Sequence, residues 1–144
     1  VLGIKVKASP ELLIRDVVIA NDKGEITCAA EIPKARSPLN VRRSGQSYSI
    51  RAILSAKNAA EQALSQLKGA QPKAIFIFDC MTRHKLLGAR IREEITIIQS
   101  ILGKSTPLIG FYTYGEIVPL GGEVGPESYS EFHNETMTLM VLGE

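Results

Sequence analysis

Apolar residues recur at steps of three and four positions in two segments of the chain, and this spacing predicts two helices. The first is expected over residues 48–68 and the second over residues 86–102. Gly69 and Gly103 follow directly and are typical helix terminators. The first helix would gather one apolar stripe from Ile50, Ile53, Leu54, Ala60, Ala63, Leu64 and Leu67.

Other apolar or β-branched segments lack helical spacing and predict strands. Their ranges are residues 2–7, 12–20, 26–32, 74–78, 106–113 and 135–142. An Asn-Asp-Lys-Gly run at 21–24 supplies turn residues, so we expect a hairpin around it. The continuous run Ala-Ile-Phe-Ile-Phe at 74–78 is typical of a strand covered on both faces. The Gly-rich residues 115–125 fit neither period and predict an irregular loop.

The predicted order of elements is β-β-β-α-β-α-β-loop-β. Strand–helix–strand crossovers in the middle favour right-handed units on a shared sheet, beside an antiparallel hairpin. We therefore expect an α+β or mixed α/β fold, with a mixed β-sheet and two main helices, formed by residues 1–144 as a single domain. Because Val1 is not an initiator residue, we also expect a fragment of a longer chain.

The composition then excludes several classes of protein. Hydrophobic residues make up 44% and charged residues 22%, which excludes a disordered or fibrous chain. No apolar run approaches the ~20 residues of a membrane span, so we expect no membrane partner. The net charge of +2 is too small to imply nucleic-acid binding. The cysteines, Cys28 and Cys80, are too few for a disulfide framework, which favours a reducing, cytoplasmic location.

The charges are unevenly distributed along the chain. Up to Lys104 there are seventeen bases and nine acids, a balance of +8, whereas the remainder has six acids and no base. We expect the acidic part to pack beside the basic part, where opposite charges attract. An acidic mouth for a cationic or amine-bearing ligand is the alternative.

Candidate chemistry gathers in three connections, the first of which follows the 74–78 strand. In sheets that contain parallel strands, ligands bind at the carboxyl ends of the strands. There Cys80 is either a thiolate activated at a helix N-terminus or a small buried hydrophobe. Arg83 offers paired donors to a carboxylate, and a salt bridge to Glu93, Glu94 or the acidic segment is its structural alternative.

The other two connections lie at 110–117 and 132–136. Gly110 and Gly115 permit close backbone approach or a bulge. Glu116, between a glycine and an isoleucine, must find a donor, so it is a ligand anchor or the partner of a base such as Arg83. Of the last connection, His133 can titrate near neutral pH or serve structurally, and Asn134 can bond local backbone.

Motifs for several standard chemistries are missing. The sequence has no phosphate-binding loop, no dinucleotide glycine spacing, no Gly-x-Ser-x-Gly and no His-Glu-x-x-His. We therefore expect no cofactor and no metal. Cys80, His133 and Glu116 can be drawn as a nucleophile, base and orienting group, although spacing in sequence does not test their distance.

Together these segments resemble the C-terminal half of FIST-type sensory domains, found in bacterial and archaeal signal-transduction proteins. The resemblance rests on Phe-Asp-Cys-Met-Thr-Arg at 78–83, Glu-Glu at 93–94, the segment 107–117 and Phe-His-Asn-x-Thr at 132–136. It covers residues 21–142, and Gly-Phe-Tyr-x-Tyr-Gly-Glu-Ile is its most specific part. It implies a ligand-sensing module, with small molecules such as amino acids as ligands and a companion N-terminal domain as partner.

The sequence departs from the family in two ways. His84 follows Arg83 where glycine is common, which would narrow the turn or add a contact. The companion N-terminal domain lies outside these residues, so a pocket shared between the two halves would be incomplete.

The resulting hypothesis is a non-catalytic small-molecule sensor with a polar pocket. In it Arg83 would engage a ligand carboxylate, and Glu116 an amine or hydroxyl. The glycines would let the backbone approach the ligand, and Phe111 would supply apolar contact. Two alternatives stay open: a cysteine-dependent enzyme using Cys80, and a scaffold that docks another domain through residues 117–120. The full set of expected site residues is Cys80, Arg83, Gly110, Phe111, Gly115, Glu116, His133 and Asn134.

Overall fold

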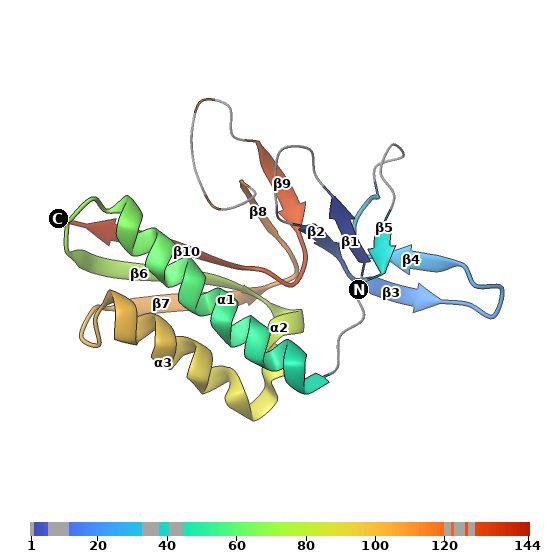
Figure 1. The fold of residues 1–144 in the computed structure, drawn as a ribbon, viewed down its shortest axis with the longest axis horizontal. Helices are drawn as coiled ribbons and strands as arrows, with labels where there is room; N and C mark the ends of the chain where they lie inside the picture. The colour runs from blue at the N-terminus through green and yellow to red at the C-terminus, as the bar shows by residue number, and fades with distance from the viewer. Residues whose placement is uncertain are drawn as a thin grey trace.

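The centre of the molecule is a three-stranded mixed sheet with two helices along one face (Figure 1). The computed structural model describes residues 2–5, 12–32, 38–40, 45–119, 122, 126 and 129–144. β6 (Pro72–Cys80) is the middle strand; it pairs antiparallel with β10 (Met137–Gly143) and parallel with β7 (Leu108–Thr113). This mixed sheet confirms the fold class that the sequence predicted.

The hydrophobic core lies between this sheet and its helices, α1 (Gly45–Gln66) and α3 (Ile91–Leu102). Alanines on α1 let the helix approach the strands closely, whereas α3 contributes larger branched side chains. Met137, Leu139 and Val141 of β10 pack against the edge of this core. The buried core residues are Ala56, Ala60, Ile75, Ile77, Ile98 and Leu102.

The first helix agrees with its prediction to within three residues at each end, but the second does not begin where expected. The segment predicted as one helix is divided into α2 (Met81–Leu87), a single 3₁₀ turn, η1 (Gly88–Arg90), and α3. α2 starts directly after β6, so Arg83 lies on a helix rather than in a turn. Gly88 has a φ of +52°, which interrupts the helical backbone between α2 and α3.

In the described residues, three shorter sheets lie toward one end of this central sheet (Figure 1). β1 (Leu2–Lys5) pairs with β2 (Leu12–Arg15) and with β5 (Pro38–Asn40). β3 (Val17–Ala20) and β4 (Ile26–Cys28) form the predicted hairpin, and Asp16 separates β2 from β3 within the segment predicted as one strand. β8 (Glu116–Pro119) pairs with β9 (Ser130–His133), so the prediction of an irregular loop is wrong at its start.

The face of the central sheet opposite the helices is partly open, which corrects the expectation of cover on both faces. Ile109 and Phe111 of β7 are 66% and 64% exposed. Phe111 makes an edge-to-face contact with Phe78, with ring centroids 5.2 Å apart. The continuous apolar run in β6 therefore packs on one side against helices and on the other against its own sheet neighbours.

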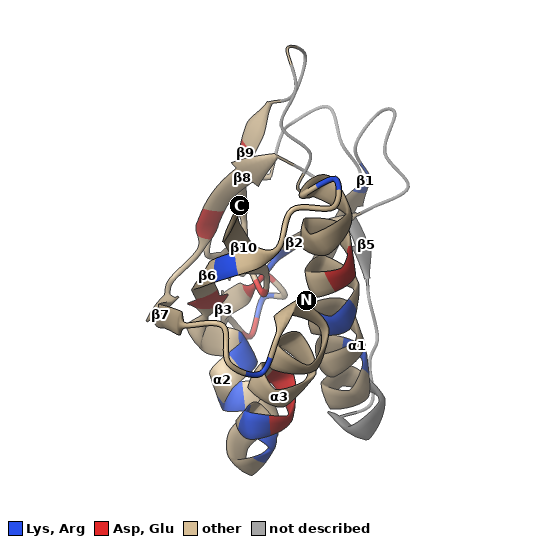
Figure 2. Cartoon of the chain, turned by 90° about the vertical axis from the view of Figure 1, so that its left-hand side faces the viewer, with Lys and Arg blue, Asp and Glu red and all other residues tan. Residues whose placement is uncertain are grey.

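Charged residues are mixed in sign where the structure describes them. Figure 2 shows basic and acidic positions side by side along α2 and α3. Lys73 Nζ lies 3.6 Å from Glu144 Oε2, a pair that joins the acidic tail to the basic part of the chain as expected. Both side chains are exposed, so this pair contributes little to stability. None of the described helices is long and apolar enough to cross a membrane.

The pairing of β6 with β7 leads to a first prediction, at Gly110. A Cβ placed there would lie 2.2 Å from the backbone oxygen of Ile77, which the sheet holds in place. We expect Gly110→Ala to lower the free energy of unfolding by about 1–3 kcal/mol in urea denaturation, because the strands must separate.

Gly24→Ala is the matched control for this prediction. Gly24 has a φ of +81°, and no atom lies within 4 Å of a Cβ placed at this position, so only backbone strain of about 1 kcal/mol applies. Equal losses at the two glycines would contradict the close approach of β6 and β7.

Candidate functional site

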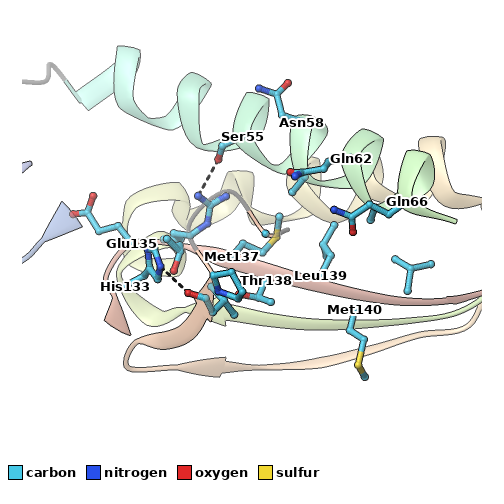
Figure 3. Close-up of a pocket in the computed structure, with 18 of the residues that line it drawn as sticks. Ser55, Asn58, Gln62, Gln66, His133, Glu135, Met137, Thr138, Leu139 and Met140 are labelled. Atoms are coloured by element: carbon cyan, nitrogen blue, oxygen red, sulfur yellow. Dashed lines mark hydrogen bonds between the residues drawn. The ribbon is translucent and has the colours of Figure 1, made fainter. Parts of the chain in front are cut away.

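A cavity of about 740 Å³ lies between α1 and β10, within the usual range of small-molecule sites (Figure 3). We call it the α1–β10 groove. α1 lines it with polar side chains three or four residues apart, and β10 lines it with residues 137–141. Val118 and Pro119 of β8 also contribute, and so does Gly122, where a Cβ would lie 3.8 Å from Gln62 Oε1. The polar residues from α1 are Ser55, Asn58, Gln62 and Gln66.

One end of the groove carries its charged and titratable groups, and we call it the polar end. It is formed by Ser55 of α1, Arg83 of α2, and His133 and Glu135 around the start of β10. A second cavity of about 240 Å³ shares Ser55, Arg83 and Glu135 with the first. The two cavities therefore meet at these three side chains.

Arg83 is buried at the polar end, where Nε forms an ion pair with Asp79 and the two terminal nitrogens donate hydrogen bonds. Nε lies 3.0 Å from Asp79 Oδ1, and Nη2 donates to Glu94 Oε1 and to the Ala52 carbonyl. Nη1 donates to Ser55 Oγ at 3.1 Å. The structural alternative from the sequence, a salt bridge with Glu94, is thus confirmed, whereas the suggested pairing with Glu116 is wrong.

Asp79 and Glu94 share this single guanidinium, and the arrangement changes the acidity of Asp79. Burial, followed by the nearby Glu94 carboxylate, raises the pKa of Asp79 to about 7, although Arg83 acts in the opposite direction. Glu94 itself is fully buried in the interior of α3. The cluster therefore takes up or releases a proton close to neutral pH.

His133 is buried and neutral. Burial lowers the pKa of His133 below its ordinary value, and its hydrogen bond with Val118 compensates only in part. Nε2 lies 3.1 Å from the Val118 carbonyl, which can only accept, so Nε2 carries the proton. Nδ1 is then the unprotonated ring nitrogen, able to accept a hydrogen bond.

Glu116 and Asn134, two of the expected site residues, hold the turn over residues 133–136. Glu116 is 5% exposed and its two oxygens accept hydrogen bonds from the hydroxyls of Thr113 and Thr136. Asn134 Oδ1 accepts from the backbone N–H of Asp16 at 3.4 Å. These residues line neither cavity, but they fix the segment that presents His133 and Glu135.

Backbone strain occurs in the same turn. Glu135 has a φ of +58°, a left-handed conformation that non-glycine residues rarely adopt. Such strain persists only where surrounding contacts impose it, and it is frequent at binding sites. Here the contacts of Asn134 and Thr136 on either side of Glu135 supply that constraint.

The other expected site residues also lie outside both cavities. Cys80 is 3% exposed, and Phe111 lies on the open face of the sheet. Gly110 admits the backbone of Ile77, and Gly115 admits the ring of Phe132, 2.1 Å from a Cβ built there. Of the eight expected residues, the structure brings only Arg83 and His133 to one cavity.

Sequence reasoning missed the polar wall that α1 contributes to the groove. Asn58, Gln62 and Gln66 recur at four-residue steps within the predicted helix, and that regular spacing of carboxamides was the available signal. Nothing in the local sequence marks the positive φ of Glu135. Among the described residues, no three His, Cys, Asp or Glu side chains are grouped so that they could hold a metal ion.

The shared guanidinium leads to a second prediction, on pH dependence. The pKa of Asp79 is 3.8 when unperturbed and about 7 in the fold, so between these values the folded state holds a proton that the unfolded state has lost. Stability from this group is complete below pH 3.8 and is lost as pH rises through 7. The parent should therefore lose about 2 kcal/mol of unfolding free energy between pH 5 and pH 8. Asp79→Asn should not show this loss.

The measurement is urea denaturation of parent and variant at a series of pH values. His133 acts in the opposite sense, because its lowered pKa costs stability as pH falls below its ordinary value of 6.5. The difference between variant and parent isolates Asp79. Asp22→Asn, in the exposed turn after β3, is the control, and parallel pH profiles for Asp79→Asn and the parent would contradict the raised pKa.

Comparison with known proteins assigns the chain to a family. Residues 1–119 match the FIST C domain, a span that includes β6, α2 and the segment 110–117 and ends before β9 and β10. No curated protein and no solved structure gives a significant match. Because the match covers most of the chain, the protein belongs to the FIST C domain family, a family of sensory domains in signal transduction.

Proposed function

We propose that this domain senses a small molecule with both a carboxylate and an amine, an amino acid being the simplest, at the polar end of the α1–β10 groove. The single observation behind the proposal is that Arg83 and His133, fifty residues apart in sequence, line the same cavity. Arg83 offers a cationic hydrogen-bond donor, and His133 offers a neutral hydrogen-bond acceptor. The role is binding, without a chemical step.

The carboxylate of the ligand would bind beside Arg83. Nη1 has two N–H groups, and among the described residues Ser55 Oγ takes one of them. Asp79 and Glu94 hold the guanidinium rigid, so little side-chain entropy is lost on binding. When Asp79 is protonated the cluster is neutral, and when it ionises the cluster repels an anion. Affinity is therefore expected to fall as pH rises from 6 to 8.

The amine of the ligand would bind on the opposite side of the polar end. His133 Nδ1 accepts a hydrogen bond because Nε2 donates to Val118. The Glu135 side chain lines the same part of the groove and provides negative charge. With Arg83 on one side and these two residues on the other, the polar end complements a zwitterion.

Ligand binding would connect elements that are far apart in sequence. Ser55, Arg83 and the 133–136 turn belong to α1, α2 and the start of β10. Asn134 bonds Asp16, and the carbonyl of Phe132 accepts from Arg15 Nη1 at 2.9 Å, so the turn is attached to the β2–β3 region. A ligand that fixes the turn can thus shift the position of the N-terminal sheets.

A thermal-denaturation panel of the twenty amino acids tests this proposal as a third prediction. At about 100 times its dissociation constant, a binding amino acid should add about 2.7 kcal/mol to the free energy of unfolding. The same amino acid should bind more tightly at pH 6 than at pH 8, for the electrostatic reason above. The panel is run on the longest soluble form of the protein.

Two histidine variants control the experiment. His133→Gln removes the Nδ1 acceptor and should weaken binding at least tenfold. His84→Gln should leave affinity unchanged, because His84 contacts Tyr112 and lines neither cavity. A flat panel, or equal loss in both variants, would reject amino-acid sensing at this end of the groove.

A further inference from the structure

β7 forms one edge of the central sheet, and its outer side is open to solvent (Figure 1). Among the strands that the structure describes, β6 alone pairs with β7. Residues 109–112 are all exposed, although successive side chains of a strand point to opposite faces. Gly110 has no side chain, so its exposure is that of bare backbone, which the helices leave uncovered. The edge of β7 is therefore accessible to a further strand.

β7 lacks the features that usually protect an edge strand from pairing. Such strands commonly contain a lysine or another charge, a proline or a β-bulge. The residues of β7, Leu-Ile-Gly-Phe-Tyr-Thr, include neither a charge nor a proline, and all six pair with β6 in an unbroken register. Its open face is also apolar, because Ile109 and Phe111 are largely exposed. These properties are typical of a strand that pairs with another chain.

The register with β6 identifies the backbone groups of β7 that point outward. Ile75 N–H donates to the Pro107 carbonyl at 2.9 Å, and Ile75 lies opposite Leu108. Successive residues of a strand direct their backbone groups to alternate sides. The odd-numbered residues of β7 therefore direct their N–H and C=O groups to β6, and the even-numbered residues direct theirs away from the sheet. The outward-facing residues are Leu108, Gly110 and Tyr112.

These outward groups are complementary to those of a second copy of the chain. A twofold axis perpendicular to the sheet at Gly110 would place Leu108 opposite the partner's Tyr112, in antiparallel pairs that exchange hydrogen bonds. On the open face, Ile109 would then lie opposite the partner's Phe111, and such aromatic–β-branched pairs stabilise adjacent strands. No like charges would meet, because β7 has none, and the glycine leaves room at the axis.

We propose that two copies of this chain associate through β7, with Gly110 at the twofold axis, and join their three-stranded central sheets into one continuous sheet. The apolar open faces of the two copies would then form a single surface. A single pair of strands buries less area than a standard interface, so the dimer is expected to be weak. β7 lines neither cavity, so this inference does not depend on amino-acid binding.

Sedimentation equilibrium at up to 0.5 mM, on the longest soluble form of the protein, tests the proposal. We expect a monomer–dimer equilibrium with a dissociation constant of about 10–500 μM. Tyr112→Pro removes an outward N–H and leaves the ladder to β6 intact, whereas Tyr112→Ala loses the same ring but keeps the N–H. The proline variant should dimerise at least tenfold more weakly than the alanine variant. A monomer at every concentration, or equal dissociation constants for the two variants, would overturn the proposal.

Ile109→Lys tests the same edge without changing the backbone. Ile109 is 66% exposed, so lysine is compatible with the fold, but in the dimer its charge would lie against the partner's Phe111. We expect at least tenfold weaker dimerisation. Ile19→Lys, at a similarly exposed position on β3, is the control and should dimerise like the parent. Equal effects of the two lysines would place the interface elsewhere and overturn the proposal.

Disulfide formation between cysteine variants tests the register. In a Cys28→Ser background, a mixture of Ile109→Cys and Phe111→Cys proteins should form a mixed disulfide, because opposite residues of a non-hydrogen-bonded pair have Cα atoms about 4.5 Å apart. Each variant alone should cross-link at least tenfold more slowly. Faster cross-linking of Phe111→Cys with itself would overturn the placement of Gly110 at the axis.

Discussion

The buried guanidinium of Arg83 is the interaction on which the arrangement of the site depends. It joins α1, β6, α2 and α3 through Ser55, Asp79 and Glu94. Removing one partner from a buried ion pair costs several kcal/mol, because the remaining charge is then uncompensated. Because Asp79 and Glu94 share one guanidinium, the pKa of Asp79 is raised to about 7, and Asp79 gains or loses its proton close to neutral pH. The same group thus holds the fold together and responds to its electrostatic surroundings.

The turn over residues 133–136 is the second fixed point, and it is held by hydrogen bonds. Thr136 bonds Glu116, Asn134 bonds Asp16, and the resulting constraint keeps Glu135 in a left-handed conformation. Because the turn is attached to the β2–β3 region and also lines the groove, it connects the α1–β10 groove with that region of the domain.

In the part of the chain that the structure describes, one face of the central sheet and the outer edge of β10 have no paired strand, and the two surfaces differ in chemistry. Its open face is apolar, with Ile109 and Phe111 exposed, whereas the outer edge of β10 presents backbone donors and acceptors beside a wall of carboxamides. Sheet edges with unpaired backbone groups recruit strands.

The sequence by itself determined the elements that depend on local patterns. The approximate bounds of α1, the 21–24 turn and the strand–helix–strand succession from β6 to β7 follow from spacing and turn residues, and the 110–117 segment carried the family resemblance. The predicted apolar stripe of α1 is wrong, because Ile50, Leu54 and Leu64 are exposed and the helix packs on the sheet through alanines. Only the tertiary structure decided the partners: Arg83 pairs with Asp79 and Glu94, Glu116 with two threonines, and Gly110 faces Ile77 rather than a ligand. Burial, register and the approach of α1 to β10 are long-range properties, because they depend on residues far apart along the chain. Local periodicity contains no information about them.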